Sequence, residues 1–291
     1  MRVKLTGEGA AMPEPARRAA RILLPIIAVA MIAAAALLIW PELNAEMNFE
    51  RARDAVTGEG APDMGAAMDL NPDTVAWLSV EGTPIDHPIV QSHGNRHRDW
   101  YLRHAYDGSA SVMGTPYLDA RATPGGTIEL VYAHNDRTGG LFHSIANADR
   151  QKGLDRIGRA IWTTKEGTTE FRPLFSIRVD KTYGPIQGFG LDEDEVPSLI
   201  DELSENAVAT VSGWEEEASR AGRLLALSTC ANGTFGGNER VICIFSAPGR
   251  NEAKGVAEEE GPSGTEAASE DQQVDLGARM PYTARLGLGA T

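Results

Sequence analysis

The chain has 291 residues, of which 27 are Lys or Arg and 41 are Asp or Glu, so its formal net charge at pH 7 is −14. A protein that binds nucleic acid needs a basic surface for the phosphates, and here Lys and Arg cluster only in the N-terminal tail. The composition therefore argues against nucleic acid as a partner. Because three stretches of the chain are not expected to pack, the length predicts a single domain with a core of moderate size.

The N-terminal part of the chain has the pattern of a membrane anchor. Residues 22–40 contain no charged side chain, and a helix of roughly 20 apolar residues crosses the hydrocarbon core of a bilayer. We therefore expect a transmembrane signal anchor at 22–40 and a single-pass protein of the cell membrane. Basic residues outnumber acidic ones in 1–21, which predicts a cytoplasmic tail and an extracellular domain. A cleaved signal peptide is the alternative, disfavoured because the apolar stretch ends without an A-x-A site.

The remaining chain divides into a stalk, an ordered domain and a tail. Residues 41–70 are expected to be a stalk or linker, because a short helical pattern is followed there by a stretch rich in Gly, Ala and Pro. The ordered domain is expected at 71–250. Its first residues, NPDT from Asn71, predict a helix start with an N-cap and a proline at the first helical position. Residues 251–291 are acidic and poor in large apolar side chains, which predicts disorder.

Short runs rich in β-branched and aromatic residues, bounded by Gly, Pro, Asn and Asp, predict a mainly β fold. The expected strands are 85–91, 115–119, 127–133, 160–164, 168–180, 224–229 and 240–246. Strands of this number and length are typical of a barrel or a sandwich. Helices are expected at 140–148 and, with an acidic first turn and amphipathic spacing, at 192–206.

Three chemically distinct side chains stand at the ends of predicted strands. His134 follows the strand at 127–133, Cys230 follows the strand at 224–229, and Arg240 begins the next strand. A thiolate is a nucleophile, and an imidazole can take its proton or hold it for a leaving amine. A guanidinium is a permanent cation that can stabilise a developing oxyanion. These residues predict an enzyme that transfers acyl groups through a thiolate.

The two cysteines are not expected to form a disulfide with each other. If Cys230 ends one strand and Arg240 begins its antiparallel neighbour, Cys243 lies deeper in that neighbour. By the alternation of side chains along a strand, it also lies on the face opposite to Arg240. Cys230 is therefore expected to be a free thiol.

Several strings together resemble a class B sortase over residues 71–247. They are NPDTVAWLSVEGTPIDHPIVQS, YLRHAYDGSASVMGTPYLDAR, YAHND with GGLF after it, and LSTC with an Arg ten residues past the Cys. The resemblance implies a sortase-type eight-stranded β-barrel, with N-terminal helices and a helix inserted before the Cys-bearing strand. The helix expected at 192–206 falls where that insertion belongs.

The same resemblance implies a cysteine transpeptidase mechanism without a cofactor. Cys230 would attack the backbone carbonyl after Thr in a sorting-signal pentapeptide, NPxTx or LPxTx-like, and form a thioester acyl-enzyme. His134 would protonate the departing amine and later deprotonate the incoming one. Arg240 would position the substrate and stabilise the oxyanion.

The resemblance also implies partners and a peptide groove. The donors would be secreted proteins with a C-terminal sorting signal, and the acceptor would be an amine of lipid II or a peptidoglycan stem peptide, or a pilin lysine. By their place in the family pattern, the residues expected to line the groove are Leu102, Tyr183, Ile186 and Ser228.

Other interpretations of the sequence stay open. The chain is alternatively a pilin-polymerising sortase, a non-catalytic wall-associated binding module, or a hydrolytic cysteine peptidase in which water resolves the thioester. No metal site is expected from the local histidines, because Gly94 breaks any helix that would place His93 and His97 on one face.

Overall fold

The computed structural model describes residues 14–56, 61–136, 139–232 and 237–250. Its strands form one sheet in the order β5-β1-β2-β3-β4-β8-β9-β6-β7, and β5 also pairs with β6. This second pairing closes eight strands into a barrel and leaves β7 outside it, at the edge. The strands are β1 (Thr74–Val80), β2 (Asp86–Val90), β3 (Tyr117–Leu118), β4 (Ile128–Tyr132), β5 (Ala160–Thr164), β6 (Gly167–Asp180), β7 (Ala207–Thr210), β8 (Arg223–Cys230) and β9 (Glu239–Ala247).

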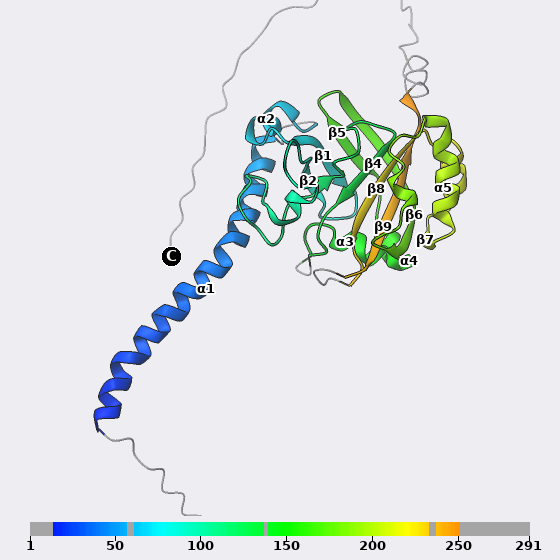
Figure 1. Cartoon of the computed structure of the whole chain (residues 1–291). Helices are drawn as coiled ribbons and strands as arrows, with labels where there is room; N and C mark the ends of the chain where they lie inside the picture. The colour runs from blue at the N-terminus through cyan, green and yellow to red at the C-terminus, as the bar shows by residue number, and fades with distance from the viewer. Residues whose placement is uncertain (1–13, 57–60, 137–138, 233–236, 251–291) are drawn as a thin grey trace, which may run out of the picture.

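Helices cover the barrel at its sides and ends (Figure 1). The α-helices are α1 (Glu14–Val56), α2 (Met64–Leu70), α3 (His143–Ala146), α4 (Gln151–Leu154), α5 (Val196–Ser204) and α6 (Trp214–Ser219). The 3-10 turns are η1 (Trp100–Arg103), η2 (Asn147–Asp149), η3 (Pro185–Gln187) and η4 (Glu193–Glu195). The predicted barrel is confirmed, and so is a helix in the 192–206 stretch, where η4 and α5 precede the Cys-bearing strand β8.

Every predicted strand has a counterpart in the sheet, but the helix predicted to start at Asn71 is wrong. Asn71 is instead the C-cap of α2, and its side-chain oxygen accepts the N–H of Asp73 at 2.9 Å in a turn that leads into β1. Its amide nitrogen donates to the carbonyl of Tyr106 at 2.6 Å. Because these bonds use the side chain of Asn71 in a turn and a tertiary contact, it does not cap a new helix, and the chain continues as strand β1. Strands β1 and β7 and helix α2 were not predicted.

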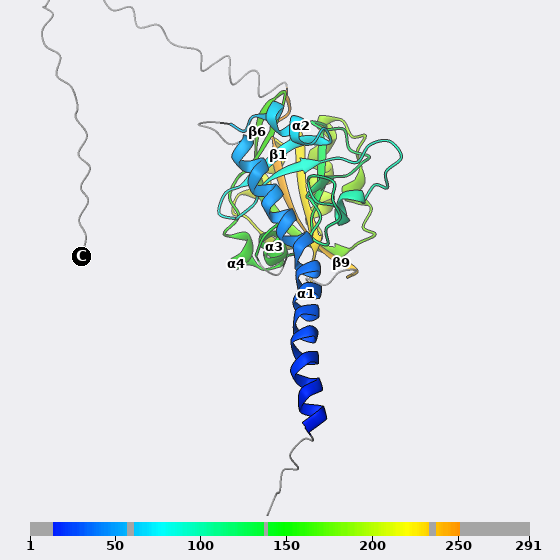
Figure 2. The ribbon, with the colours of Figure 1, turned by 90° about the vertical axis from the view of Figure 1, so that its left-hand side faces the viewer.

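Helix α1 is one continuous element of 43 residues. Figures 1 and 2 show it extending from the barrel, with its C-terminal part beside α2 and β2. Within the described part of the chain, no helix has both the length and the apolar character needed to cross a membrane. The expected anchor at 22–40, the single-pass location with a cytoplasmic tail and extracellular domain, and the membrane as a partner are therefore wrong. The apolar stretch is part of a longer helix that also carries charged residues and ends with Ala52 and Val56 buried.

Two hydrophobic cores lie on opposite faces of β8. Leu225 and Leu227 belong to a cluster that gathers residues from strands all round the barrel. Leu224 and Ala226 point the other way, into a cluster that includes Ile200 of α5. Burial on both faces explains why this strand is a continuous apolar run rather than an alternating one. It also fixes the register of β8, because a slip by one residue would exchange the two faces.

An ionisable residue is enclosed within the barrel wall. Glu129 of β4 is fully buried, and the guanidinium of Arg223 lies near it at the start of β8. Burial raises the pKa of Glu129 to about 7, and the positive charge of Arg223 opposes this effect only in part. The folded protein therefore holds a proton at Glu129 under conditions in which the unfolded chain has lost it.

We predict that Glu129→Gln flattens the pH dependence of stability. Between an unfolded pKa of about 4.3 and the raised folded pKa, the folded state binds more protons, so stability falls as the pH rises. Between pH 4 and pH 8, the free energy of unfolding of the wild type should fall by up to about 3 kcal/mol relative to that of the variant. Urea unfolding at several pH values measures this difference. Glu166→Gln, at an exposed site, is the control, and a pH-independent difference between wild type and Glu129→Gln would contradict the assignment.

Candidate functional site

The catalytic candidates meet because β8 has a parallel neighbour on one side and an antiparallel neighbour on the other. Tyr132 of β4 pairs with Ser228 of β8 in parallel, so His134 and Cys230 follow at the same end of the sheet. On the other side, Cys230 pairs directly with Arg240 of β9. Paired residues share a face, and side chains alternate along each strand. The three predicted residues therefore lie together on the outer face of the barrel.

They line an open pocket of about 1040 Å³. Its wall also contains all of the predicted groove residues, Leu102, Tyr183, Ile186 and Ser228. Ile186 and Ser228 are only 2% and 1% exposed, so most of each side chain packs into the body of the protein. The sequence did not indicate the further polar lining by Asp119, Arg121, Tyr132 and Gln187.

His134 is held by a backbone carbonyl. Its Nε2 lies 2.9 Å from the carbonyl oxygen of Leu102 in η1. A carbonyl oxygen only accepts hydrogen bonds, so Nε2 carries a proton and Nδ1 is the nitrogen that titrates. Burial lowers the pKa of His134, the Leu102 carbonyl acts in the opposite direction, and the charges of Arg103 and Arg240 lower it further. The imidazole is therefore mainly neutral at neutral pH.

The two cysteines have different environments. Both are free thiols, as expected. Cys230 is partly exposed in the pocket, whereas Cys243 pairs with Leu227 and is 1% exposed in the barrel core. Burial raises the pKa of the Cys243 thiol far above its usual range, and a buried thiol of this kind is unreactive. Cys230 is the nucleophile candidate.

Arg240 contacts the loop that leads into β9. Its Nη1 donates to the carbonyl oxygens of Gly237 at 2.7 Å and Glu239 at 3.1 Å. These bonds orient the guanidinium at the pocket wall, beside the strand that carries Cys230.

Side chains extend the ladder between β4 and β8 beyond its last backbone pair. Thr229 donates its hydroxyl to the carbonyl of Ala133 at 2.8 Å. The amide nitrogen of Asn135 donates to the carbonyl of Cys230 at 2.9 Å, and its oxygen lies 3.0 Å from Nδ1 of His143. Asn135 therefore connects the residue after the histidine to the backbone of the cysteine. Sequence reasoning missed this role, for which the asparagine next to His134 was the available signal.

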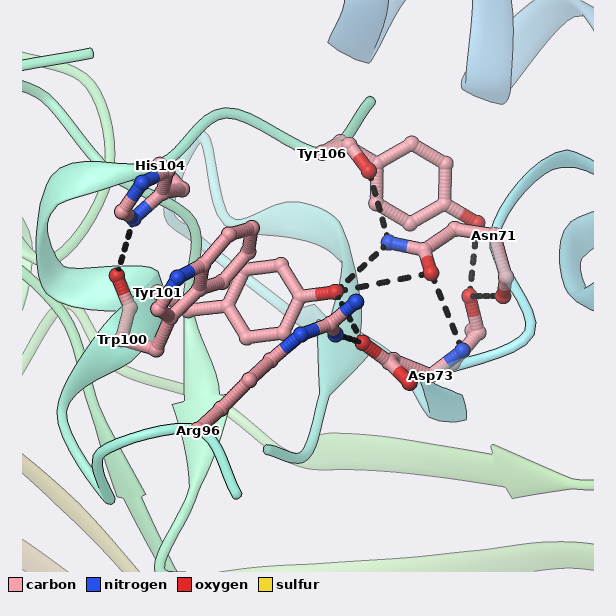
Figure 3. Close-up of polar contacts among 8 residues, drawn as sticks. Asn71, Asp73, Arg96, Trp100, Tyr101, His104 and Tyr106 are labelled. Carbon is pink, nitrogen blue, oxygen red and sulfur yellow. Dashed lines mark hydrogen bonds and ion pairs between the residues drawn. The ribbon is translucent and has the colours of Figure 1, made fainter. Parts of the chain in front are cut away.

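A polar network fixes the η1 turn that holds His134 (Figure 3). The hydroxyl of Tyr101 donates to Asp73 at 2.6 Å, and Arg96 forms an ion pair with the same carboxylate. The ring of Trp100 stacks on His104, with centroids 3.6 Å apart, and Nδ1 of His104 donates to the Trp100 carbonyl at 2.6 Å. The turn is thus tied to the segment between α2 and β1.

Gly114 packs against the same turn. It has a φ of +62°, and a Cβ there would lie 2.5 Å from the carbonyl oxygen of Tyr101 and 2.6 Å from that of Leu102. Only glycine fits this approach, because the neighbouring atoms are backbone.

No family model matches the chain. It is 28% identical to Sortase B of Listeria monocytogenes over 183 residues, which cover 60% of this chain and 70% of that protein. Its fold is similar to sortase B of Clostridium perfringens, with a TM-score of 0.53 and 22% identity over 62% of this chain and 96% of that one. A Staphylococcus aureus sortase B–substrate complex gives a TM-score of 0.56 and 16% identity, covering 74% and 97% of the two chains.

We predict that Gly114→Ala lowers the pKa of His134. The new methyl group would displace the Leu102 carbonyl, whose hydrogen bond raises that pKa. Gly94→Ala is a matched control, because Gly94 also has a positive φ, +66°, but a Cβ there meets nothing within 4 Å. NMR titration of the His134 ring measures the pKa. Equal pKa values of His134 in Gly114→Ala and Gly94→Ala would show that the Leu102 carbonyl does not affect the pKa of the histidine.

Proposed function

We propose that the chain is a class B sortase and that Cys230 is the nucleophile of its transpeptidation. The pairing of Cys230 with Arg240, with His134 after the strand on the other side of β8, is the observation that most supports this assignment. The family supplies the reaction type. The residues of this chain supply the roles that follow.

In the first half-reaction, a sorting-signal pentapeptide of the NPxTx or LPxTx type lies in the pocket. Cys230 loses its proton to Nδ1 of His134, and its sulfur attacks the carbonyl carbon after Thr. The tetrahedral oxyanion develops near the Arg240 guanidinium, which stabilises it electrostatically. The C–N bond then breaks, the imidazolium returns the proton to the departing amine, and a thioester remains on Cys230.

In the second half-reaction, an amine replaces the departed peptide. His134 takes a proton from the amine, whose nitrogen attacks the thioester carbonyl, and the sulfur of Cys230 leaves. We propose an amine of a cell-wall precursor as the acceptor. The sorting peptide is proposed to contact Leu102, Tyr183, Ile186 and Ser228, which supply parts of the pocket wall.

We predict that the full chain forms an acyl adduct on Cys230 with one class of NPxTx or LPxTx peptide and transfers it to an amine. Mass spectrometry of intact protein and products detects both steps. Cys230→Ala should abolish the adduct and the product. Cys243→Ala should retain both, because that thiol is buried in the core. Unchanged product formation by Cys230→Ala would overturn the proposed nucleophile.

We predict that Asn135→Ala and Asn135→Asp lower kcat roughly tenfold, with a smaller effect on KM. Either change removes the donor to the Cys230 carbonyl, and a lost hydrogen bond at such a partly buried position costs about 1–1.5 kcal/mol. Steady-state kinetics with the best peptide measure both constants. A purely stabilising role would instead lower the melting temperature and leave kcat unchanged in the folded fraction.

A further inference from the structure

The charge of the pocket differs from that of the whole chain. The chain has 27 basic against 41 acidic residues, whereas the pocket wall has five basic residues against three acidic ones. The basic residues are Arg98, Arg103, Arg121, Lys181 and Arg240, and the acidic ones are Asp99, Asp119 and Asp180. A locally positive cleft on an acidic protein attracts anions that the rest of the surface repels.

Three of these cations, Arg98, Arg103 and Lys181, are exposed and form no ion pair within the described part of the chain, and the first two lie in the loop that contains η1. The guanidinium of Arg121 is occupied by Asp119 at 2.7 Å, and Arg96, which precedes the pocket residues in the same loop, is occupied by Asp73 (Figure 3). We call Arg98 and Arg103 the arginine rim.

The arginine rim flanks the turn that holds the catalytic histidine. Arg98 precedes η1 and Arg103 ends it, and the carbonyl of Leu102 between them accepts the hydrogen bond from His134. The charge of Arg103 also acts on His134. In the proposed function the acceptor amine must come within hydrogen-bond distance of the His134 ring. The part of the acceptor next to its amine therefore lies beside the arginine rim.

We propose that the arginine rim binds a negatively charged group, carboxylate or phosphate, on the amine acceptor. This inference rests on the proposed function and adds the chemical class of the second substrate. Arginine presents a fork of donors that matches both kinds of oxyanion. The rim selects anionic amines over neutral ones of the same size. Its contribution is electrostatic and decreases as the ionic strength rises.

The test compares acceptors that differ only in charge. The full chain is loaded with its sorting peptide, and aminolysis is measured with Nα-acetyl-lysine against Nα-acetyl-lysine amide, and with phosphoethanolamine against ethanolamine. For each pair, kcat/KM of aminolysis is normalised to thioester formation without acceptor. The wild type should prefer at least one anionic member by roughly three- to tenfold at low salt, as expected for one or two exposed charge pairs. A preference confined to one pair identifies carboxylate or phosphate as the ligand.

Charge reversal locates the preference. In the double variant Arg98→Glu, Arg103→Glu the anionic preference should disappear or reverse. Arg156→Glu is exposed and lies outside the pocket wall, so it should keep the preference of the wild type. The proposed role of the arginine rim would be overturned by either of two results. One is an equal kcat/KM for both members of each pair in the wild type, and the other is a preference for anionic amines that survives in the double variant.

The adduct on Cys230 separates this failure from that of the proposed function. If a thioester forms and reacts equally with neutral and anionic amines, the transpeptidase assignment stands and the rim is wrong. If no peptide acylates Cys230, the proposed nucleophile fails and the rim proposal fails with it.

Discussion

The site depends on the pairing of β8 with β4 on one side and β9 on the other. Ala133 and Thr229 are 96 residues apart in the chain, yet the parallel ladder leads both strands to the same end of the barrel. The antiparallel β9 then supplies Arg240 directly opposite Cys230. Because side chains alternate with a period of two, a slip of one residue in any of these strands would move one of the proposed catalytic side chains to the wrong face. The two cores on either face of β8 make such a slip costly, since the small Ala226 and the large Leu227 would exchange faces.

Strand pairing alone does not position the site residues, because β4 and β8 stop pairing at Tyr132 and Ser228, before His134 and Cys230. Beyond that point no ladder joins β4 to β8, although β8 stays paired with β9 as far as Cys230, and specific polar contacts replace it. Asn135 and Thr229 hold the segment after β4 against the end of β8, and the Leu102 carbonyl orients the imidazole of His134. The η1 turn is in turn fixed by Asp73 through Tyr101. The site therefore combines a rigid sheet with local hydrogen bonds that tolerate little displacement.

The sequence predicted what depends on strand periodicity and side-chain chemistry. Strand boundaries near His134, Cys230 and Arg240 followed from apolar runs and turn residues, and the placement of Cys243 on the face opposite to Arg240 followed from alternation. Contacts made by backbone atoms left no sequence signal, so the Leu102 carbonyl was not foreseen. The NPDT string failed because Asn71 uses its side chain in tertiary bonds, which local capping rules do not include. The composition of the apolar stretch before the domain predicted a membrane span, but α1, which contains this stretch, is not both long and apolar enough for one among the described residues.

The electrostatics of His134 suit a reaction in which one group acts as both acid and base. Burial and the two nearby arginines lower its pKa, which favours the neutral imidazole that the proposed reaction needs to receive a proton from the thiol or the incoming amine. The same shift makes the imidazolium a stronger acid when the departing amine needs a proton. A larger shift would weaken the base too far, and the Leu102 carbonyl opposes it by stabilising the protonated ring. The hydrogen bond that orients the histidine therefore also limits how far its pKa falls, so that geometry and proton affinity are set by the same turn.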